Sequence, residues 1–416
     1  MLSKKPKIIY LRALNYLNNM ELLAPAGNML KLKTALAFGA DAVYLGIPDF
    51  SLRVRINDFD LTSLQTGIAY AHQKKKKVYI TINIFAHNQH LTKLNAYIKK
   101  LKELKVDALI VSDPGIIAVI KKSWPKATIH LSTQANCTNW QAAKFWQKQG
   151  VKRIILGREV TLTEIKEIHQ KCPKLELEYF VHGAMCMAYS GRCFLSKYLT
   201  DRSANLGDCI QPCRWEYFIR PKDSEAEFVL GQEEHGSYLL NSKDLCLLPY
   251  LAELKKAGIS SFKIEGRAKS VYYQGVVVGI YKKAMSIINQ KNAASQKILK
   301  SLDKDLKTKI IHRGYTTGFL LRDKADQNLA DSHYGNDWEF CGQVIKGRIK
   351  VHNSLKIGDQ VELVCPGYEV IKKKIKKIID CQTKKEVSEA HGGSNQELNI
   401  PDFINVPEFS VLRRKI

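Results

Sequence analysis

Short apolar runs alternate with segments of helical periodicity from Glu21 to about residue 290. The apolar runs are rich in β-branched residues, as expected for strands buried in a parallel sheet. Segments such as HLTKLNAYIKKLKELK place apolar residues three or four positions apart, which is typical of helices that cover a sheet. The pattern predicts eight strands, over residues 21–27, 42–46, 78–83, 108–113, 128–134, 153–157, 177–183 and 261–266.

This alternation predicts an α/β fold, a (β/α)8 TIM-like barrel over residues 21–292. A doubly wound open sheet is the alternative, because strand order is not visible in one sequence. No Gly-x-Gly-x-x-Gly or Walker-type loop follows a predicted strand, which disfavours nucleotide-binding versions.

Two further regions depart from the barrel pattern. A Cys-rich insertion at 184–260 separates the last two strands, with a predicted hairpin (EYFIRP and SYLLNSKDLC) and the helix LLPYLAELKKAG. Loops this long in a compact domain are usually functional. A helical linker is expected over 293–334. Residues 335–416 predict a small β-barrel domain, because short strands alternate there with Gly-Asp and Pro-Gly turns. Such a domain could contact RNA or serve only in packing.

The charge is strongly positive, with 65 Lys and Arg against 40 Asp and Glu, a net charge of +25. Such a field favours polyanions and predicts contact with nucleic acid, although solvated lysine runs such as 74–77 need no ligand. No apolar run is long enough to span a bilayer, so no membrane contact is expected. The basic extension at 1–20 lacks a signal-peptide pattern, so we expect a cytoplasmic protein with reduced cysteines.

Polar residues follow the predicted strands, where barrel enzymes place their chemistry. Buried polar groups are costly unless they pair with each other or with a ligand, and either explanation fits them singly. Arginine matches carboxylates and phosphates, so Arg158 and Arg267 are candidates for binding such groups. Glu159 and Glu265 could orient these arginines or move protons. The catalytic candidates are Glu159, Glu265 and His182, although His182 alone also fits a core histidine. The other substrate-binding candidates are Asn83, His87, Gln134 and Lys263.

The cysteine pattern is Cys186-x6-Cys193-x15-Cys209-x3-Cys213, followed by Cys246. Four thiolates suit either tetrahedral zinc or a [4Fe–4S] cluster. Zinc sites commonly use closely spaced pairs, and the first pair here is wide, which favours a cluster. The radical-SAM spacing Cys-x3-Cys-x2-Cys is absent. Spacing does not decide whether Cys213 or Cys246 is the fourth ligand.

Several long motifs together resemble the collagenase-like peptidase U32 family. They are ELLAPAG, GADAVYLG, LIVSDPG, IHLSTQAN, GREV, EYFVHGAMCMAYSGRCFLS, GDCIQPCRW, NSKDLC and FKIEGR. The length, the segment GDCIQPCRWEY and the β-rich tail are most similar to the tRNA-hydroxylating branch of this family. The resemblance implies oxygen-independent hydroxylation of the wobble uridine of tRNA to 5-hydroxyuridine, with prephenate as cosubstrate. It also implies an iron–sulfur cluster held by Cys186, Cys193 and Cys209, with Cys213 or Cys246 completing the set.

Other functions remain as alternatives at this point. Related enzymes hydroxylate ribosomal RNA or a quinone precursor, and a paralogous partner subunit is a further candidate partner beside tRNA. A zinc-stabilised RNA-binding scaffold would also use four thiolates. A thiol peptidase using Cys186 with His182 would leave the neighbouring cysteines without a purpose, and no His-Glu-x-x-His or Gly-x-Ser-x-Gly motif is present.

Overall fold

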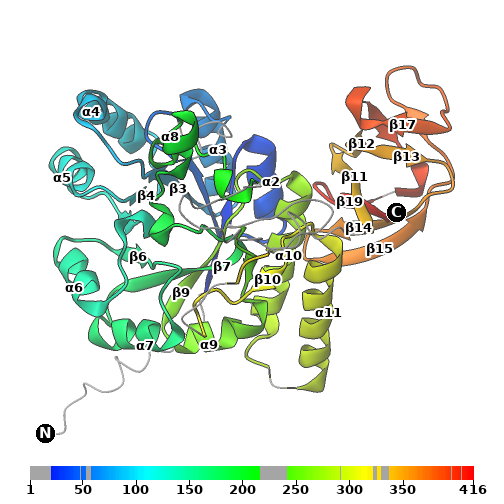
Figure 1. The fold of residues 1–416 in the computed structure, drawn as a ribbon. Helices are drawn as coiled ribbons and strands as arrows, with labels where there is room; N and C mark the ends of the chain where they lie inside the picture. The colour runs from blue at the N-terminus through cyan, green and yellow to red at the C-terminus, as the bar shows by residue number, and fades with distance from the viewer. Residues whose placement is uncertain are drawn as a thin grey trace, which may run out of the picture.

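The computed structural model describes residues 20–46, 48–52, 58–215, 241–290, 292–321, 326–328, 337–394, 396–403 and 405–416. In this part of the chain, eight parallel strands close into a barrel, because β9 pairs with β1 on one side and with β7 on the other (Figure 1). The predicted (β/α)8 fold is therefore confirmed. The barrel strands are β1 (Glu21–Pro25), β2 (Ala42–Gly46), β3 (Lys77–Ile82), β4 (Ala108–Val111), β5 (Ile129–Leu131), β6 (Arg153–Ile155), β7 (Glu176–Ala184) and β9 (Ile259–Ile264).

All eight predicted strands are present, and most of their ends differ from the prediction by one or two residues. The largest difference is at β5, predicted over 128–134 but ending at Leu131. A 3-10 turn, η2 (Thr133–Ala135), takes the rest of that segment. Residues Ser132 and Gln134 therefore lie on a turn above the strand and not on a continuous strand face.

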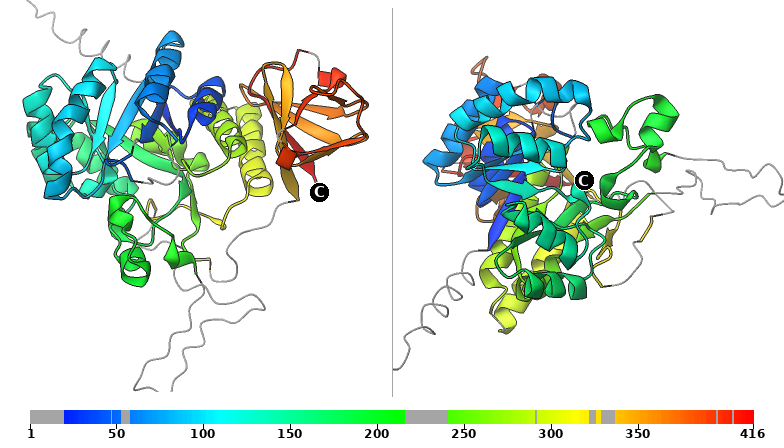
Figure 2. Two further views of the ribbon diagram at one scale, coloured as in Figure 1. Left: turned by 90° about the horizontal axis from the view of Figure 1, so that it is seen from above. Right: turned by 90° about the vertical axis from the view of Figure 1, so that its left-hand side faces the viewer.

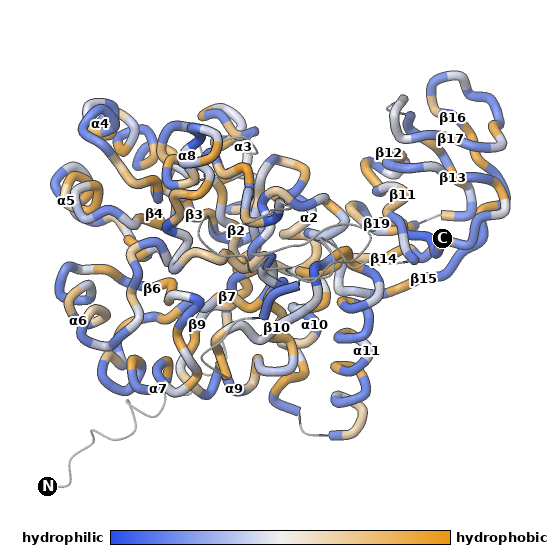
Figure 3. The backbone as a smooth tube through the Cα atoms, in the orientation of Figure 1, coloured by the Kyte–Doolittle hydropathy of each residue, from blue (hydrophilic) through white to orange (hydrophobic). Residues whose placement is uncertain are grey.

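The helices surround the barrel and turn their apolar faces toward it (Figures 2 and 3). Several begin at a side chain that accepts a hydrogen bond from the first turn, such as Asn28, Asp113, Asn139 and Thr161. The helices are α2 (Met29–Ala37), α3 (Leu61–Gln73), α4 (Asn88–Glu103), α5 (Pro114–Ser123), α6 (Trp140–Lys148), α7 (Leu162–Lys171), α9 (Leu251–Lys256) and α10 (Val271–Ile287). Within the described residues, no helix is both long and apolar enough to cross a membrane.

A layer of ion-paired side chains fills the interior of the barrel near the amino ends of its strands. The buried guanidinium group of Arg153 forms ion pairs with Glu21, Glu176 and Glu178, the last at 3.0 Å. The other oxygen of the Glu178 carboxylate lies 2.9 Å from Nζ of Lys263. Mutual pairing of this kind satisfies charges that burial would otherwise make very costly.

The insertion between β7 and β9 lies at the carboxyl end of the barrel, and α8 stands off the ring of helices there (Figure 2). The predicted hairpin falls largely on residues 216–240, outside the described residues. Its last residues form β8, which pairs antiparallel with β7. The described elements are η3 (Tyr189–Gly191), α8 (Leu195–Thr200), η4 (Ala204–Leu206), η5 (Pro212–Arg214), β8 (Asp244–Cys246) and η6 (Leu248–Tyr250).

Beyond the barrel, α11 (Ala293–Lys309) and β10 (Tyr315–Thr316) lead to a C-terminal antiparallel region beside α10 and α11 (Figure 1). A seven-stranded sheet in the order β15-β14-β19-β11-β12-β18-β16 and a two-stranded sheet β13-β17 enclose a separate apolar core. Arg413 of this region forms an ion pair with Asp305 of α11, which connects the region to the helix that follows the barrel. Its elements are β11 (Trp338–Ile345), β12 (Arg348–Val351), β13 (Ser354–Lys356), β14 (Gln360–Cys365), β15 (Glu369–Lys374), β16 (Ile379–Asp380), β17 (Glu389–His391), η7 (Gly392–Ser394), β18 (Glu397–Asn399), η8 (Pro401–Phe403) and β19 (Val411–Lys415).

Candidate active site at the mouth of the barrel

A cavity of about 140 Å³ lies where the carboxyl ends of the barrel strands meet the Cys-rich insertion. The barrel contributes its polar wall, and the insertion contributes thiols. Among the predicted site residues, ten line this cavity: Asn83, Gln134, Arg158, Lys263, Glu265, Arg267, Cys186, Cys193, Cys209 and Cys213. All four cysteines of this set, and three of its six other members, therefore come from one stretch of the chain, residues 176–267.

Three cations line the cavity, and their surroundings differ. Arg267 is fixed by hydrogen bonds to the hydroxyl of Ser51, at 3.0 Å, and to the carbonyl of Leu52. Lys263 is held by Glu178, and burial lowers the pKa of its ammonium group, a shift that the Glu178 carboxylate opposes. Two of the three charges are therefore anchored by the protein itself.

The guanidinium group of Arg158 lies 4.0 Å from the centre of the Phe180 ring. Within the described residues, it makes no hydrogen bond or ion pair with another side chain. A stacked, half-buried guanidinium with its donors unused is suited to a planar anion such as a carboxylate. Arg158 is thus the cation best placed to accept a ligand.

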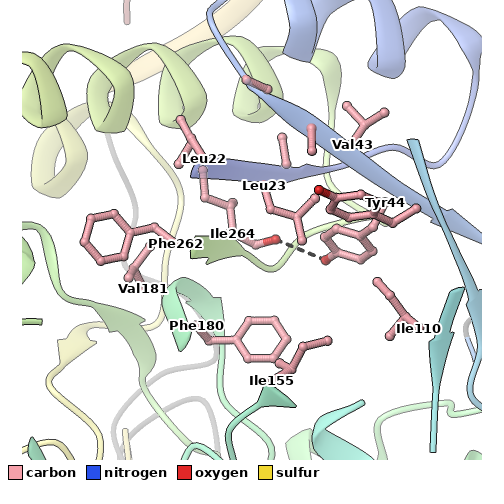
Figure 4. Packing of buried hydrophobic residues seen from close by; sticks show 14 of the residues in the cluster. Leu22, Leu23, Val43, Tyr44, Ile110, Ile155, Phe180, Val181, Phe262 and Ile264 are labelled. Atoms are coloured by element: carbon pink, nitrogen blue, oxygen red, sulfur yellow. Dashed lines mark hydrogen bonds between the residues drawn. The ribbon is translucent and has the colours of Figure 1, made fainter. Parts of the chain in front are cut away.

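Two aromatic side chains that the sequence analysis missed form the apolar wall of the cavity. Tyr44 and Phe180 point toward each other across the barrel, and the hydroxyl of Tyr44 donates to the carbonyl of Ile264 at 3.0 Å (Figure 4). The ammonium group of Lys263 lies 4.4 Å from the Tyr44 ring centre and 5.4 Å from that of Phe180. Both aromatics have apolar neighbours on either side in the chain, so no alternation distinguished them from core residues.

The amide pair Asn83 and Gln134 forms another part of the wall. Nδ2 of Asn83 donates to Oε1 of Gln134 at 3.2 Å, and the Ser132 hydroxyl donates to the same oxygen. Oδ1 of Asn83 accepts from the backbone N–H of Leu52 at 3.1 Å. These bonds fix the orientation of both amides, so the wall is preorganised before any ligand binds.

Hydrogen bonds from the barrel hold the first part of the cysteine loop. Ser190, with φ of +50°, donates from its backbone N–H to Glu159 at 2.7 Å and from its hydroxyl to Asn136 at 2.8 Å. Arg192 donates to the carbonyl of Gln134 at 2.9 Å and 3.1 Å. The segment between Cys186 and Cys193 is therefore anchored on both sides to the barrel rim.

The second part of the loop is braced by bonds within itself and by one bond to the segment that follows β3. The N–H of Cys193 donates to Asn205 at 3.2 Å, and the carbonyl of Asn205 accepts from Phe85 at 3.0 Å. Arg202 forms a two-pronged ion pair with Asp208. This bracing presents Cys193 and Cys209 to the same cavity.

The four cavity thiols influence one another electrostatically. Burial raises the pKa of the Cys213 thiol, nearby Arg214 lowers it, and Cys186, Cys209 and Cys193 each raise it further. Within the described residues, no group of three or more His, Cys, Asp or Glu side chains is arranged so that it could hold a metal ion. Four thiols facing one cavity are the donor set that either a thiolate-bound cluster or tetrahedral zinc would require. The four residues fit such a group in number and in facing one cavity.

Cys246 lies elsewhere. It is buried on β8, and its sulfur lies 3.8 Å from the hydroxyl of Tyr281. Burial raises the pKa of this thiol to about 11, which opposes thiolate formation. The structure brings Cys213, and not Cys246, to the other three cysteines.

His182 also lies apart from the cavity. Its ring packs among Tyr273, Tyr281 and Tyr315, with Nδ1 3.3 Å from the hydroxyl of Tyr281. Burial lowers the pKa of His182 to about 3, so the ring is neutral at physiological pH. The predicted catalytic role, and its pairing with Cys186 in a peptidase, has no support in this placement.

Two more predicted residues are not among those lining the cavity. Glu159 lies beneath the cysteine loop, where its carboxylate accepts from Ser190, so its place is that of a positioning residue. His87 is exposed at the N-terminus of α4, where its ring lies 6.0 Å from that of His90. The carboxyl end of β3 thus contributes Asn83 to the cavity, whereas His87 is too far along the loop.

The chain matches the model of peptidase family U32 over residues 27–330. Among curated proteins, this chain is similar to "tRNA hydroxylation protein P" of Haemophilus influenzae. The two are 38% identical, and the match covers 95% of this chain and 96% of that protein. The Escherichia coli protein of the same name is 39% identical over 83% of this chain and 86% of its own length. The "23S rRNA 5-hydroxycytidine C2501 synthase" of E. coli is 35% identical over 76% of this chain but only 47% of its own. The family match spans well over half of the chain, and the chain belongs to peptidase family U32.

Proposed function

We propose that this protein hydroxylates RNA, and that its substrate is the wobble uridine of tRNA, converted to 5-hydroxyuridine without O2 and with prephenate as cosubstrate. The observation that carries the proposal is the convergence of four thiols and three cations on one cavity. Thiols gathered beside cations suit redox chemistry on an anionic substrate better than peptide hydrolysis. Two relatives that match this chain over most of both lengths are named tRNA hydroxylation protein P, whereas the match to the ribosomal RNA synthase covers only 47% of that protein, which supports tRNA over ribosomal RNA.

The cysteines would hold the redox group. A [4Fe–4S] cluster bound by Cys186, Cys193, Cys209 and Cys213 would supply electron transfer next to the substrate. Three of these thiols are half-buried and Cys186 is exposed, so the group would lie at the boundary between cavity and solvent. Zinc in the same place would supply only structural support, which is the scaffold alternative.

The barrel residues would bind and orient the two substrates. Arg158 offers unused donors to a carboxylate of prephenate, and Arg267 lies across the same cavity. Tyr44 and Phe180 provide faces against which a planar base or ring can pack. A wobble nucleotide lies in a loop, so moving it into a recessed cavity costs little stacking energy. Glu265, also in the wall, is the remaining acid–base candidate.

Two experiments test the proposal. Nucleosides from the tRNA of a strain lacking this protein should contain less 5-hydroxyuridine, and expression of the protein should restore it. Unchanged 5-hydroxyuridine in a strain that lacks any second enzyme of this activity would contradict the proposal. Anaerobic purification should give protein with bound iron and sulfide, whereas a colourless preparation with stoichiometric zinc would support the scaffold.

A further inference from the structure

The Cys-rich insertion carries an unusual concentration of exposed aromatic side chains. Among the described residues, the exposed aromatics are Phe145, Tyr189, Phe194, Tyr198 and Trp215, and four of the five belong to this insertion. Phe194 and Tyr198 are 77% and 86% exposed. Single exposed apolar residues are ordinary, but a cluster next to a cavity indicates an interaction surface.

Phe194 and Tyr198 lie next to the cavity, because Phe194 adjoins cavity-lining residues in the chain and α8 connects it to Tyr198. Phe194 lies between Cys193 and Leu195, both of which line the cavity. The N–H of Tyr198 donates to the carbonyl of Phe194 at 2.8 Å, the four-residue spacing that places two side chains on the same helical face. One side of this short segment therefore forms the cavity wall while the adjacent side presents two aromatic rings to solvent.

The charge of the same segment indicates which partner it fits. Residues 186–215 contain four basic residues, Arg192, Lys197, Arg202 and Arg214, and two acidic ones, Asp201 and Asp208. Both acids are already paired, with Lys197 and Arg202. Arg192 is exposed and bonds to a neutral carbonyl, so its positive charge is not compensated there. Aromatic faces beside excess positive charge are the features that bind unpaired nucleotides.

We infer that Phe194 and Tyr198 form a stacking platform for the unpaired nucleotides of an RNA loop, next to the nucleotide that enters the cavity. This inference rests on the proposed function, and it adds the surface that selects a single-stranded loop over a duplex. The bases of a duplex are stacked on each other and cannot offer their faces to these rings. The platform thus accounts for how a chain of high positive charge distinguishes a loop from the stems of any RNA.

Equilibrium binding of a labelled RNA hairpin, whose loop copies a tRNA anticodon loop, tests the inference. Wild-type protein should bind the hairpin more tightly than a fully paired duplex of the same length. Phe194→Ala and Tyr198→Ala should each raise the Kd for the hairpin by about 5- to 150-fold, the range for loss of one stacked base, with little effect on the duplex. Phe194→Trp should bind like wild type, whereas Phe194→Leu, apolar but without a ring, should behave like the alanine variant.

Phe145→Ala is the matched control, because Phe145 is 54% exposed on α6, outside the insertion and the cavity. It should leave the Kd unchanged. An unaltered hairpin Kd in the double variant Phe194→Ala and Tyr198→Ala would overturn the platform, as would a wild-type dimer that the double variant converts to monomer. If the wild-type protein bound neither the hairpin nor the duplex, the proposed function would be overturned together with the platform. An effect seen only in the double variant concerns the platform alone, so the two failures are distinguishable.

Discussion

The carboxylate of Glu159 accepts a hydrogen bond of 2.7 Å from the backbone N–H of Ser190, whose φ is +50°. This bond joins the loop that follows β6 to the middle of the loop between Cys186 and Cys193. The left-handed backbone at Ser190 is unfavourable for a residue with a side chain, so the contact helps to hold a conformation that the loop would not adopt alone.

Removing this acceptor should loosen the cysteine loop. Glu159→Ala is expected to lower the iron and sulfide content of anaerobically purified protein, because two of the proposed ligands lose their fixed separation. Glu159→Gln keeps an acceptor oxygen and should retain most of the iron. Equal iron content in both variants and wild type would show that the bond does not position the ligands.

The cysteines allow a matched pair of variants. Cys213→Ala should lose bound iron and hydroxylation activity, because it removes one thiol of the cavity. Cys246→Ala should keep both and lose only about 1 kcal/mol of stability, as for a small buried group. The comparison requires iron analysis, the tRNA nucleoside assay and a denaturant titration on the same preparations. The reverse pattern would identify Cys246 as the fourth ligand.

If prephenate is the cosubstrate, as proposed, Arg158 should contribute to the binding of its carboxylates. A hydrogen bond to a charged group contributes about 1.5–3 kcal/mol, so Arg158→Ala should raise the KM for prephenate by about 10- to 150-fold. Arg158→Lys should recover part of this loss, since it keeps the charge but not the two-pronged geometry. Arg348→Ala, at an exposed position on β12, serves as the control and should leave KM unchanged. A normal KM in Arg158→Ala would exclude this role.

Acid should destabilise the fold through its buried histidines. Burial lowers the pKa of His182 to about 3, opposed by the charge of Asp244, whereas in the unfolded chain the ring titrates near 6.5. Between these values the unfolded state binds more protons, so the free energy of unfolding decreases as the pH falls below about 6.5. The expected slope is about 1.4 kcal/mol per pH unit for this histidine. Burial lowers the pKa of His130 in the same direction.

Urea titrations at pH 7, 6 and 5 measure this effect. The free energy of unfolding of His182→Gln should depend less steeply on pH by about the slope of one histidine. Parallel curves for wild type and His182→Gln would contradict the assignment.

The sequence predicted the barrel well because its strands are short and mostly apolar, and several are followed by a helix start such as Asp113 or Thr161. It also singled out the four cysteines that line the cavity, but within a set of five, because spacing alone does not decide between Cys213 and Cys246. It did not reveal that His182 lies apart from the cavity, because a polar residue at the carboxyl end of a barrel strand is expected at the mouth of the barrel. The register of β7 against β9 shifts between Phe180 and His182, and the ring turns toward α10 instead. Neither this irregularity nor the inward position of Tyr44 has a local sequence signal.

The ionic layer of Arg153, Glu178 and their partners closes the barrel below the cavity. The carboxyl end of the barrel is therefore the side from which we expect ligands to enter and leave the cavity. If the RNA and the proposed cosubstrate both use that side, the ligand that binds deeper should enter first and leave last. Steady-state kinetics of this protein should accordingly follow a compulsory order and not a random one.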